Sequence, residues 1–309
     1  MSKFGFESST YEVLAGVDLE GKQVIVTGGA SGLGFETARA LGSKGAHVVL
    51  VGRNAEKLEM AKIQLMRFGQ TKVDTELMDL EDLDSVKVAA ESLLSRYPKI
   101  DILINNAGIM ACPLARTKQG FESQFGTNHL AHFLFTCLLA PPLIAAGDAR
   151  VVNLSSSGHH RGAVNFEDPN YQSTPYDKWE AYGASKTANA LFSVGLNARL
   201  KPRGVLSYAV HPGMIPTGLG RHLVPEDLAH FATAPEPFKT EPQGSATSVW
   251  AATAAELADK GGSFLANCQI AEINDGPIPI GVKTYATSQE NADKLWEISE
   301  KLVGATFSW

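Results

Sequence analysis

The chain has 309 residues, of which 44 % are hydrophobic and only 19 % are charged, and this balance excludes an intrinsically disordered protein. The net charge of -6 argues against nucleic-acid binding, because no basic excess is present to neutralise a phosphate backbone. The three cysteines, Cys112, Cys137 and Cys268, form no C-x-x-C pair, so neither a disulfide framework nor a metal site is expected.

Short apolar runs alternate with longer segments of helical spacing along most of the chain. The runs are rich in Val, Ile or Leu, as buried strands are, and lie at residues 23–27, 47–51, 72–78, 101–105, 150–154 and 205–210. Residues 34–44 and 83–97 show helical spacing between them. The alternation predicts right-handed crossovers and a doubly wound parallel α/β sheet, a Rossmann fold. This single domain is expected over residues 21–275, between an N-terminal extension (1–20) and a C-terminal extension (276–309).

The first predicted strand leads through a glycine-rich turn into a helix. The turn has the pattern T-G-x-x-x-G-x-G, with Gly28, Gly32 and Gly34 at its glycine positions. Glycine lets the backbone approach a ligand closely, and the free N–H groups of the first helical turn can bind a pyrophosphate. In this strand–turn–helix context the pattern predicts a dinucleotide site.

The end of the second strand indicates which dinucleotide binds. An acid there would take the ribose hydroxyls of NAD, whereas an arginine accepts the 2′-phosphate of NADP. Here Gly52 stands where the acid is expected and Arg53 follows it. A guanidinium pairs well with a phosphate, so we predict NADP(H). The alternative is that Arg53 is a solvated loop residue or caps the strand.

The most apolar long stretch, residues 129–146, holds His132 and the pair Pro141 and Pro142. It falls short of the run of about 20 apolar residues that crosses a bilayer. The N-terminus has no basic segment followed by an apolar one, so no signal peptide is predicted. With its few cysteines, the protein is expected to be cytoplasmic, without an integral membrane segment.

Two polar motifs follow the fifth predicted strand. Ser155, Ser156 and Ser157 stand at its carboxyl end, where ligands bind in such sheets, and one of the three can bind a substrate oxygen. Tyr182 and Lys186 are spaced i, i+4 and so share one helix face. An ammonium beside a phenol would lower the tyrosine pKa from about 10 and suit it to proton exchange. Taken alone, this pair also fits an exposed helix face.

Residues 212–240 contain five prolines and are expected to form a long irregular excursion, either a lid over the site or an inert surface loop. Its apolar side chains favour an apolar substrate, although they also suit the packing of the lid itself; they are Met214, Leu219, Leu223, Val224, Phe231 and Phe238. Residues 288–303 have the pattern of an amphipathic helix docked on the body.

Together these motifs resemble the short-chain dehydrogenases/reductases. The resemblance covers nearly the whole chain in the right order and is carried by residues 27–34, 105–108, 156, 182–186 and 212–213. Residues 105–110, 121–122, 125, 128–130 and 132–134 are most similar to the retinol-dehydrogenase-like branch. Ser156 and Tyr182 lie 26 positions apart, about twice the gap usual in the broad family. That branch has a similar insertion. Because of the longer gap, Ser155 and Ser157 remain alternatives to Ser156.

The resemblance implies roles for the matching residues. Tyr182 would be the general acid/base, Lys186 would lower its pKa and bind the nicotinamide ribose, and Ser156 would hold the carbonyl oxygen. Asn128 would hold a water in a proton relay to Lys186, although taken alone it fits a helix cap. The other implied cofactor contacts are Ser31 and Leu33 in the turn, Asp79 and Leu80 at the adenine, Asn106, Ala107 and Gly108 along the cofactor, and Pro212, Gly213, Ile215 and Thr217 near the nicotinamide and phosphates.

The predicted function is an NADP(H)-dependent oxidoreductase that interconverts a ketone or aldehyde and an alcohol. One alternative is a non-catalytic dinucleotide-binding sensor or scaffold with the same fold. Another is a different chemistry on this fold, such as light-driven or epimerising reduction. The expected partner is a small-molecule carbonyl or alcohol, and no nucleic acid. The family usually forms dimers or tetramers, and a homo-oligomer stays open.

Overall fold

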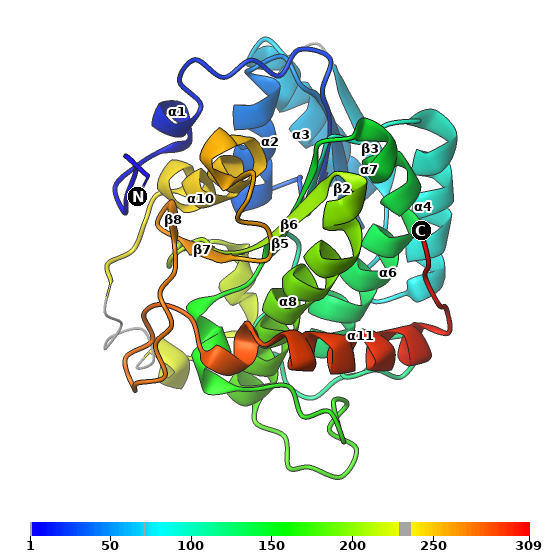
Figure 1. Cartoon of the computed structure of the whole chain (residues 1–309), viewed down its shortest axis with the longest axis vertical. Coiled ribbons are helices and arrows are strands. Elements are labelled where there is room, and N and C mark those ends of the chain that lie inside the picture. The colour runs from blue at the N-terminus through cyan, green and yellow to red at the C-terminus, as the bar shows by residue number, and fades with distance from the viewer. Residues whose placement is uncertain (1, 71, 229–235) are drawn as a thin grey trace.

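The computed structural model describes residues 2–70, 72–228 and 236–309. Within these residues one sheet of eight strands has the order β3-β2-β1-β4-β5-β6-β7-β8 (Figure 1). β1 to β7 pair in parallel, and β8 joins the edge antiparallel to β7. The strands are β1 (Gln23–Thr27), β2 (His47–Gly52), β3 (Val73–Leu77), β4 (Ile102–Asn105), β5 (Ala149–Leu154), β6 (Val205–His211), β7 (Phe264–Ala266) and β8 (Gln269–Ile270).

Helices cover both faces of this sheet (Figure 1). One face carries α1 (Thr10–Val13), α2 (Gly32–Gly42), α3 (Ala55–Arg67) and α10 (Glu241–Thr253). The other carries α4 (Leu83–Arg96), α5 (Ser123–Phe125), α6 (Ala131–Leu138), α7 (Ala140–Ala146), α8 (Lys178–Leu200) and α11 (Gln289–Val303). A short π-helix, Gly126–Leu130, joins α5 to α6.

The alternation of side chains along β1 shows why both faces need cover. Val24 and Val26 pack into the core on the α2 side with Leu50, whereas Ile25 packs into the opposite core with Val49. Side chains of successive strand residues point to opposite faces, so a run of apolar residues is stable only between two helical layers. The predicted doubly wound parallel fold is therefore confirmed.

The six predicted strands are present, each within one residue of its expected ends. The short strands β7 and β8 were not predicted. Of the 212–240 excursion, the described part forms two short 3₁₀ helices, Gly218–His222 and Pro225–Leu228. Residues 229–235, and with them Phe231, lie outside the described residues.

Both predicted extensions pack against the body. In the N-terminal segment, the Thr10 hydroxyl donates to the buried Glu36 carboxylate at 2.5 Å. At the other end α11, which includes the predicted helix over 288–303, lies across α8 and places Trp296 against Phe133 and Phe192 (Figure 1). The domain boundaries themselves stay a prediction.

Among the described residues, no single helix is long and apolar enough to cross a membrane. Two segments, Ser123–Leu138 and Ala140–Ala146, satisfy the length and composition criteria only as a pair bent by 58°. Most side chains of this pair are buried in the core between the sheet and its helices.

Candidate active site

The turn after β1 packs so closely against the start of α2 and against Asn106 that only glycine fits at Gly34. Gly28 has φ +66°, which favours glycine. A Cβ atom at Gly34 would lie 2.3 Å from the Gly28 carbonyl oxygen and 2.5 Å from Asn106 Nδ2. Ser31 precedes α2 in an extended conformation, and its hydroxyl does not cap the helix. Ser31 therefore leaves the first N–H groups of α2 uncapped, and the glycine turn that leads into them fits the pyrophosphate of a dinucleotide.

Thr27 joins the glycine turn to the end of β4. Its hydroxyl oxygen accepts from the backbone N–H of Asn106 at 2.9 Å and of Ala107 at 3.0 Å. The Asn106 side chain donates in return to the Thr27 carbonyl at 2.9 Å. These bonds bring two predicted cofactor segments together. The turn motif in the sequence includes Thr27, but it does not indicate that the Thr27 hydroxyl binds the backbone after β4.

The segment after β6 reaches the same turn. The Thr217 side chain lies 3.5 Å from the position of a Cβ on Gly32. Ile215 packs with Leu33 against Gly244 of α10 so closely that a Cβ there would overlap both. Pro212 and Gly213 connect β6 to this segment, and Gly213 lies against the stem of Lys239. The predicted phosphate contacts after β6 are thus beside Gly32 and Leu33.

Arg53 lies at the end of β2, as the NADP prediction requires, but it already has a partner. Its Nη1 is 3.0 Å from Glu81 Oε1, and the two side chains are 57 % and 43 % exposed. Glu81 follows the predicted adenine contacts Asp79 and Leu80, and its N–H donates to the Asp79 carboxylate at 3.0 Å. The Glu81 carboxylate beside Arg53 was not predicted from the sequence.

Ser156, Tyr182 and Lys186 come together at the carboxyl ends of β5 and β6. The Ser155 hydroxyl donates to the Lys186 carbonyl at 2.7 Å, so it points into α8. Ser156 instead lies beside Tyr182, where its side chain acts against the rise of the tyrosine pKa, and its hydroxyl oxygen accepts from Gly158 N–H at 3.0 Å. Lys186 Nζ lies 5.7 Å from the centre of the Tyr182 ring. Among the three serines, Ser156 is the one placed beside the tyrosine.

Burial dominates the electrostatics of this pair. It raises the pKa of Tyr182 to about 12, and it lowers the pKa of Lys186 to about 8. The expected lowering of the Tyr182 pKa is therefore wrong. Desolvation of the phenolate outweighs the opposing effect of Ser156, and the Lys186 ammonium donates to the Leu154 carbonyl at 3.0 Å. Tyr182 is held as the neutral phenol, the form that donates a proton.

Asn128 lies in the π-helix, next to Gly108 and Lys186. A Cβ on Gly108 would be 3.0 Å from Asn128 Oδ1 and 3.5 Å from Lys186 Nζ. The Asn128 amide donates to the Ile109 carbonyl and to the Ser185 hydroxyl, while its oxygen accepts from Ile109 N–H. The side chain is thus engaged in joining three segments, and the predicted water relay stays a prediction.

Apolar side chains surround Tyr182. It packs with Ala111 and Trp179, and Met110 and Leu223 complete the cluster. Met110 and Ala111 follow β4, whereas Leu223 comes from the predicted lid. The arrangement places an apolar wall beside the phenol.

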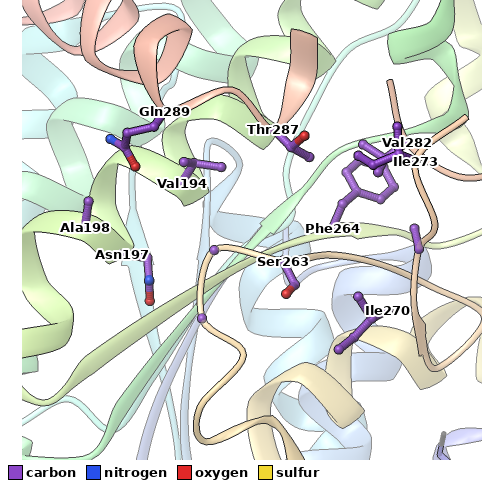
Figure 2. A pocket seen from close by; sticks show the side chains of 13 residues that line it. Val194, Asn197, Ala198, Ser263, Phe264, Ile270, Ile273, Val282, Thr287 and Gln289 are labelled. Carbon is purple, nitrogen blue, oxygen red and sulfur yellow. The ribbon is translucent and has the colours of Figure 1, made fainter. Parts of the chain in front are cut away.

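A separate pocket of about 430 Å³ opens between α8, the β7–β8 edge and the segment before α11 (Figure 2). Phe264, Val282 and Ile273 form part of its wall, with Asn197 and Gln289 nearby. None of the predicted site residues lines it. No group of three or more His, Cys, Asp or Glu in the described ranges is placed to hold a metal ion.

A family model and several relatives match most of this chain. The family model described as short chain dehydrogenase matches residues 22–227. The chain belongs to this family. Retinol dehydrogenase 12 from Homo sapiens is 38 % identical over 290 residues, covering 93 % of this chain and 88 % of that protein. Short-chain dehydrogenase/reductase prx1 from Penicillium roqueforti is 37 % identical over 299 residues, covering 93 % of this chain and 86 % of the relative.

Solved structures extend the comparison. A crystal structure of an uncharacterised protein from Mycobacterium paratuberculosis has a TM-score of 0.74 at 35 % identity, covering 94 % of this chain and 97 % of that one. RhlG from Pseudomonas aeruginosa, in an active-site complex with NADP, has a TM-score of 0.66 at 26 % identity, covering 81 % and 95 %. The predicted family, its retinol-dehydrogenase-like branch and the fold are confirmed, and the protein is a dinucleotide-dependent oxidoreductase.

Proposed function

We propose that the protein interconverts a ketone or aldehyde and the corresponding alcohol with NADP(H), acting on an apolar small molecule. The observation that carries the proposal is the setting of Tyr182, a buried phenol that lies beside Ser156 and Lys186. A phenol placed beside a serine hydroxyl and an ammonium at the carboxyl ends of the strands can give a proton to a substrate oxygen held there.

When bound, the dinucleotide supplies the hydride that passes to or from the carbonyl carbon. The N–H groups after Gly28 would hold its pyrophosphate, Arg53 its 2′-phosphate and Lys186 its nicotinamide ribose. Ser156 Oγ donates a hydrogen bond to the substrate oxygen and positions it beside Tyr182 Oη. In reduction, Tyr182 gives its proton to that oxygen, and the Lys186 ammonium stabilises the phenolate that results.

The preference for NADP(H) is supported by Arg53 and by the missing acid at Gly52. A carboxylate at Gly52 would repel a 2′-phosphate, and a guanidinium at the end of β2 can pair with one. RhlG from Pseudomonas aeruginosa, whose fold is similar, forms an active-site complex with NADP, which adds support by similarity.

The apolar wall around Tyr182 favours an apolar substrate. Met110, Ala111, Trp179 and Leu223 present hydrocarbon and indole surface beside the reacting phenol. Such surface stabilises a bound molecule by removing its apolar area from water and also keeps bulk water from the proton transfer. The likeness to proteins named retinol dehydrogenase is in keeping with this choice.

The alternative of a non-catalytic sensor or scaffold gains no support. Dinucleotide binding alone requires the glycine turn, and it does not require Ser156 and Tyr182 to meet at the carboxyl ends of the strands.

The test is NADPH oxidation with a panel of apolar ketones and aldehydes. We expect Tyr182→Phe to lower kcat at least about 100-fold, because it removes the proton donor, while NADPH affinity stays within about twofold. Tyr11→Phe is the matched control, since Tyr11 is 62 % exposed and should retain wild-type kcat. A Tyr182→Phe variant as fast as the wild type would refute the proposed chemistry.

A further inference from the structure

One peptide group beside Tyr182 is held from both sides by histidines. The carbonyl oxygen of Ser156 accepts from His159 Nδ1 at 2.6 Å. The N–H of Ser157, which belongs to the same peptide group, donates to His211 Nδ1 at 3.1 Å. His159 lies in the 3₁₀ turn after β5, whereas His211 ends β6. Side chains from two separate elements, the 3₁₀ turn and β6, thus hydrogen-bond the Ser156–Ser157 peptide group.

The two bonds require opposite forms of the imidazole. A carbonyl oxygen only accepts, so His159 must carry its proton on Nδ1. Its Nε2 is then the acceptor for the Lys283 N–H at 3.2 Å, which agrees with this tautomer. A backbone N–H only donates, so Nδ1 of His211 must be bare and its proton must be on Nε2.

Burial keeps both rings in these neutral forms. His159 is fully buried, with its ring 4.3 Å from that of His160 and 4.8 Å from that of Phe264, and His211 is 9 % exposed. Desolvation lowers the pKa of His159 to about 4 and that of His211 to about 3. Neither ring is charged near neutral pH, so neither hydrogen bond is lost to protonation.

The C-terminal extension supports this arrangement. Besides the Lys283 N–H, the Tyr285 hydroxyl donates to the His159 carbonyl at 2.6 Å. Phe264 and Val282, which form part of the wall of the pocket in Figure 2, lie in one buried cluster that also includes Ala286. The segment at 282–286 therefore closes over His159 from outside the predicted domain.

We propose that His159 and His211 form a clamp on the Ser156–Ser157 peptide that directs the Ser156 hydroxyl toward Tyr182, and that the Lys283–Tyr285 segment holds the clamp in place. The inference rests on the proposed function, because it assumes that Ser156 binds the substrate oxygen. Neither histidine touches the reacting atoms, so both are positioning residues. Their effect is on the direction of the Cα–Cβ bond of Ser156, and an error of about 1 Å in a reacting group can lower a rate about 100-fold.

Matched substitutions distinguish whether each histidine acts through its hydrogen bond to the Ser156–Ser157 peptide or only through the volume of its side chain. Asn places an amide oxygen or nitrogen where Nδ1 of histidine lies, whereas Leu has a similar shape and no polar atom. We expect His211→Leu and His159→Leu to lower kcat for carbonyl reduction about 10- to 100-fold. His211→Asn and His159→Asn should recover most of it. NADPH affinity should stay within about twofold in all four variants, because the glycine turn is untouched.

A readout independent of catalysis is the tautomer of each ring. In protein carrying ¹⁵N-imidazole histidine at pH 7, His159 should show its proton on Nδ1 and His211 on Nε2. The signals are assigned by their loss in the two Asn variants. The proposal is overturned if either ring has the other tautomer, or if the folded Leu variants, judged by circular dichroism and Tm, keep wild-type kcat.

These outcomes also separate the clamp from the proposed function. If the wild type reduces no carbonyl, the proposed function fails, and with it the catalytic meaning of the clamp. If the wild type is active and Tyr182→Phe is inactive while the Leu variants match the wild type, only the clamp fails.

Discussion

Arg53 should set the preference for NADP(H), and Glu81 should weaken it. The two side chains form an exposed ion pair at 3.0 Å. A 2′-phosphate that binds Arg53 must share the guanidinium with this carboxylate or displace it. The pair also places a negative charge next to the phosphate, so removal of Glu81 and removal of Arg53 should have opposite effects on NADPH affinity.

The magnitudes follow from the exposure of the pair. A hydrogen bond to a charged group contributes about 1.5–3 kcal/mol, and breaking an exposed ion pair costs about 0.2–1 kcal/mol. The net loss in Arg53→Ala should then be about 1–2 kcal/mol, or about 5- to 30-fold weaker NADPH binding. Glu81→Gln should tighten NADPH binding by up to about fivefold. NADH lacks the 2′-phosphate, so its affinity should change little in either variant.

The assay is a fluorescence titration of NADPH and NADH on the wild type, the two single variants and the double variant. Lys87→Ala, which removes a surface cation on α4, controls for a general loss of positive charge. The double variant should lose the gain of Glu81→Gln, because that gain acts through Arg53. The reasoning is refuted if Arg53→Ala keeps the wild-type ratio of NADPH to NADH affinity. A Glu81→Gln variant that binds NADPH more weakly would show instead that the pair orients Arg53 for the phosphate.

Three further outcomes test the site. Lys186→Met should raise the free energy of unfolding at pH 7 by about 3 kcal/mol in urea titrations, because burial lowers the Lys186 pKa from 10.5 to about 8. The unfolded lysine binds more protons between pH 8 and 10.5, so wild-type stability rises with pH there and the advantage of the variant shrinks toward zero. Asp227→Asn should raise KM for apolar substrates severalfold without weakening NADPH binding in steady-state kinetics, since Asp227 joins Lys178 and Trp179 of α8 to Val224 N–H of the lid segment. Gly34→Ala should abolish NADPH binding and lower Tm, because its Cβ would overlap the Gly28 carbonyl, whereas Gly5→Ala, with open space around it, should do neither.

The sheet was predictable because its strands are buried on both faces. A run such as Val24, Ile25 and Val26 has no polar position, and all three side chains are buried only if the strand lies between two helical layers. β7 and β8 lack this signal because they have three and two residues. β7 forms because β6 offers a free edge to Phe264 and Leu265, and β8 then pairs with β7; no local sequence pattern indicates either pairing.

The candidate site was predictable where its residues are close in sequence. The glycine turn and the Tyr182–Lys186 pair each span a few positions, so spacing alone indicates a shared face or a shared turn. The choice among Ser155, Ser156 and Ser157 needed the fold, because consecutive residues at a strand end point in different directions. Ser155 meets the Lys186 carbonyl and Ser156 meets Tyr182.

Partners that are distant in sequence were not predicted, because only the fold brings them together. Glu81 lies 28 positions from Arg53, and His211 lies 54 positions from Ser157, so no spacing rule connects them. The direction of the Tyr182 pKa shift was also predicted wrongly. Spacing i, i+4 places an ammonium near the phenol, but it carries no information on how deeply both are buried. Here desolvation is the largest cause of the raised Tyr182 pKa, and Lys186 Nζ donates to the Leu154 carbonyl. A Y-x-x-x-K pattern therefore predicts which groups meet, while the surrounding fold determines which protonation state they hold.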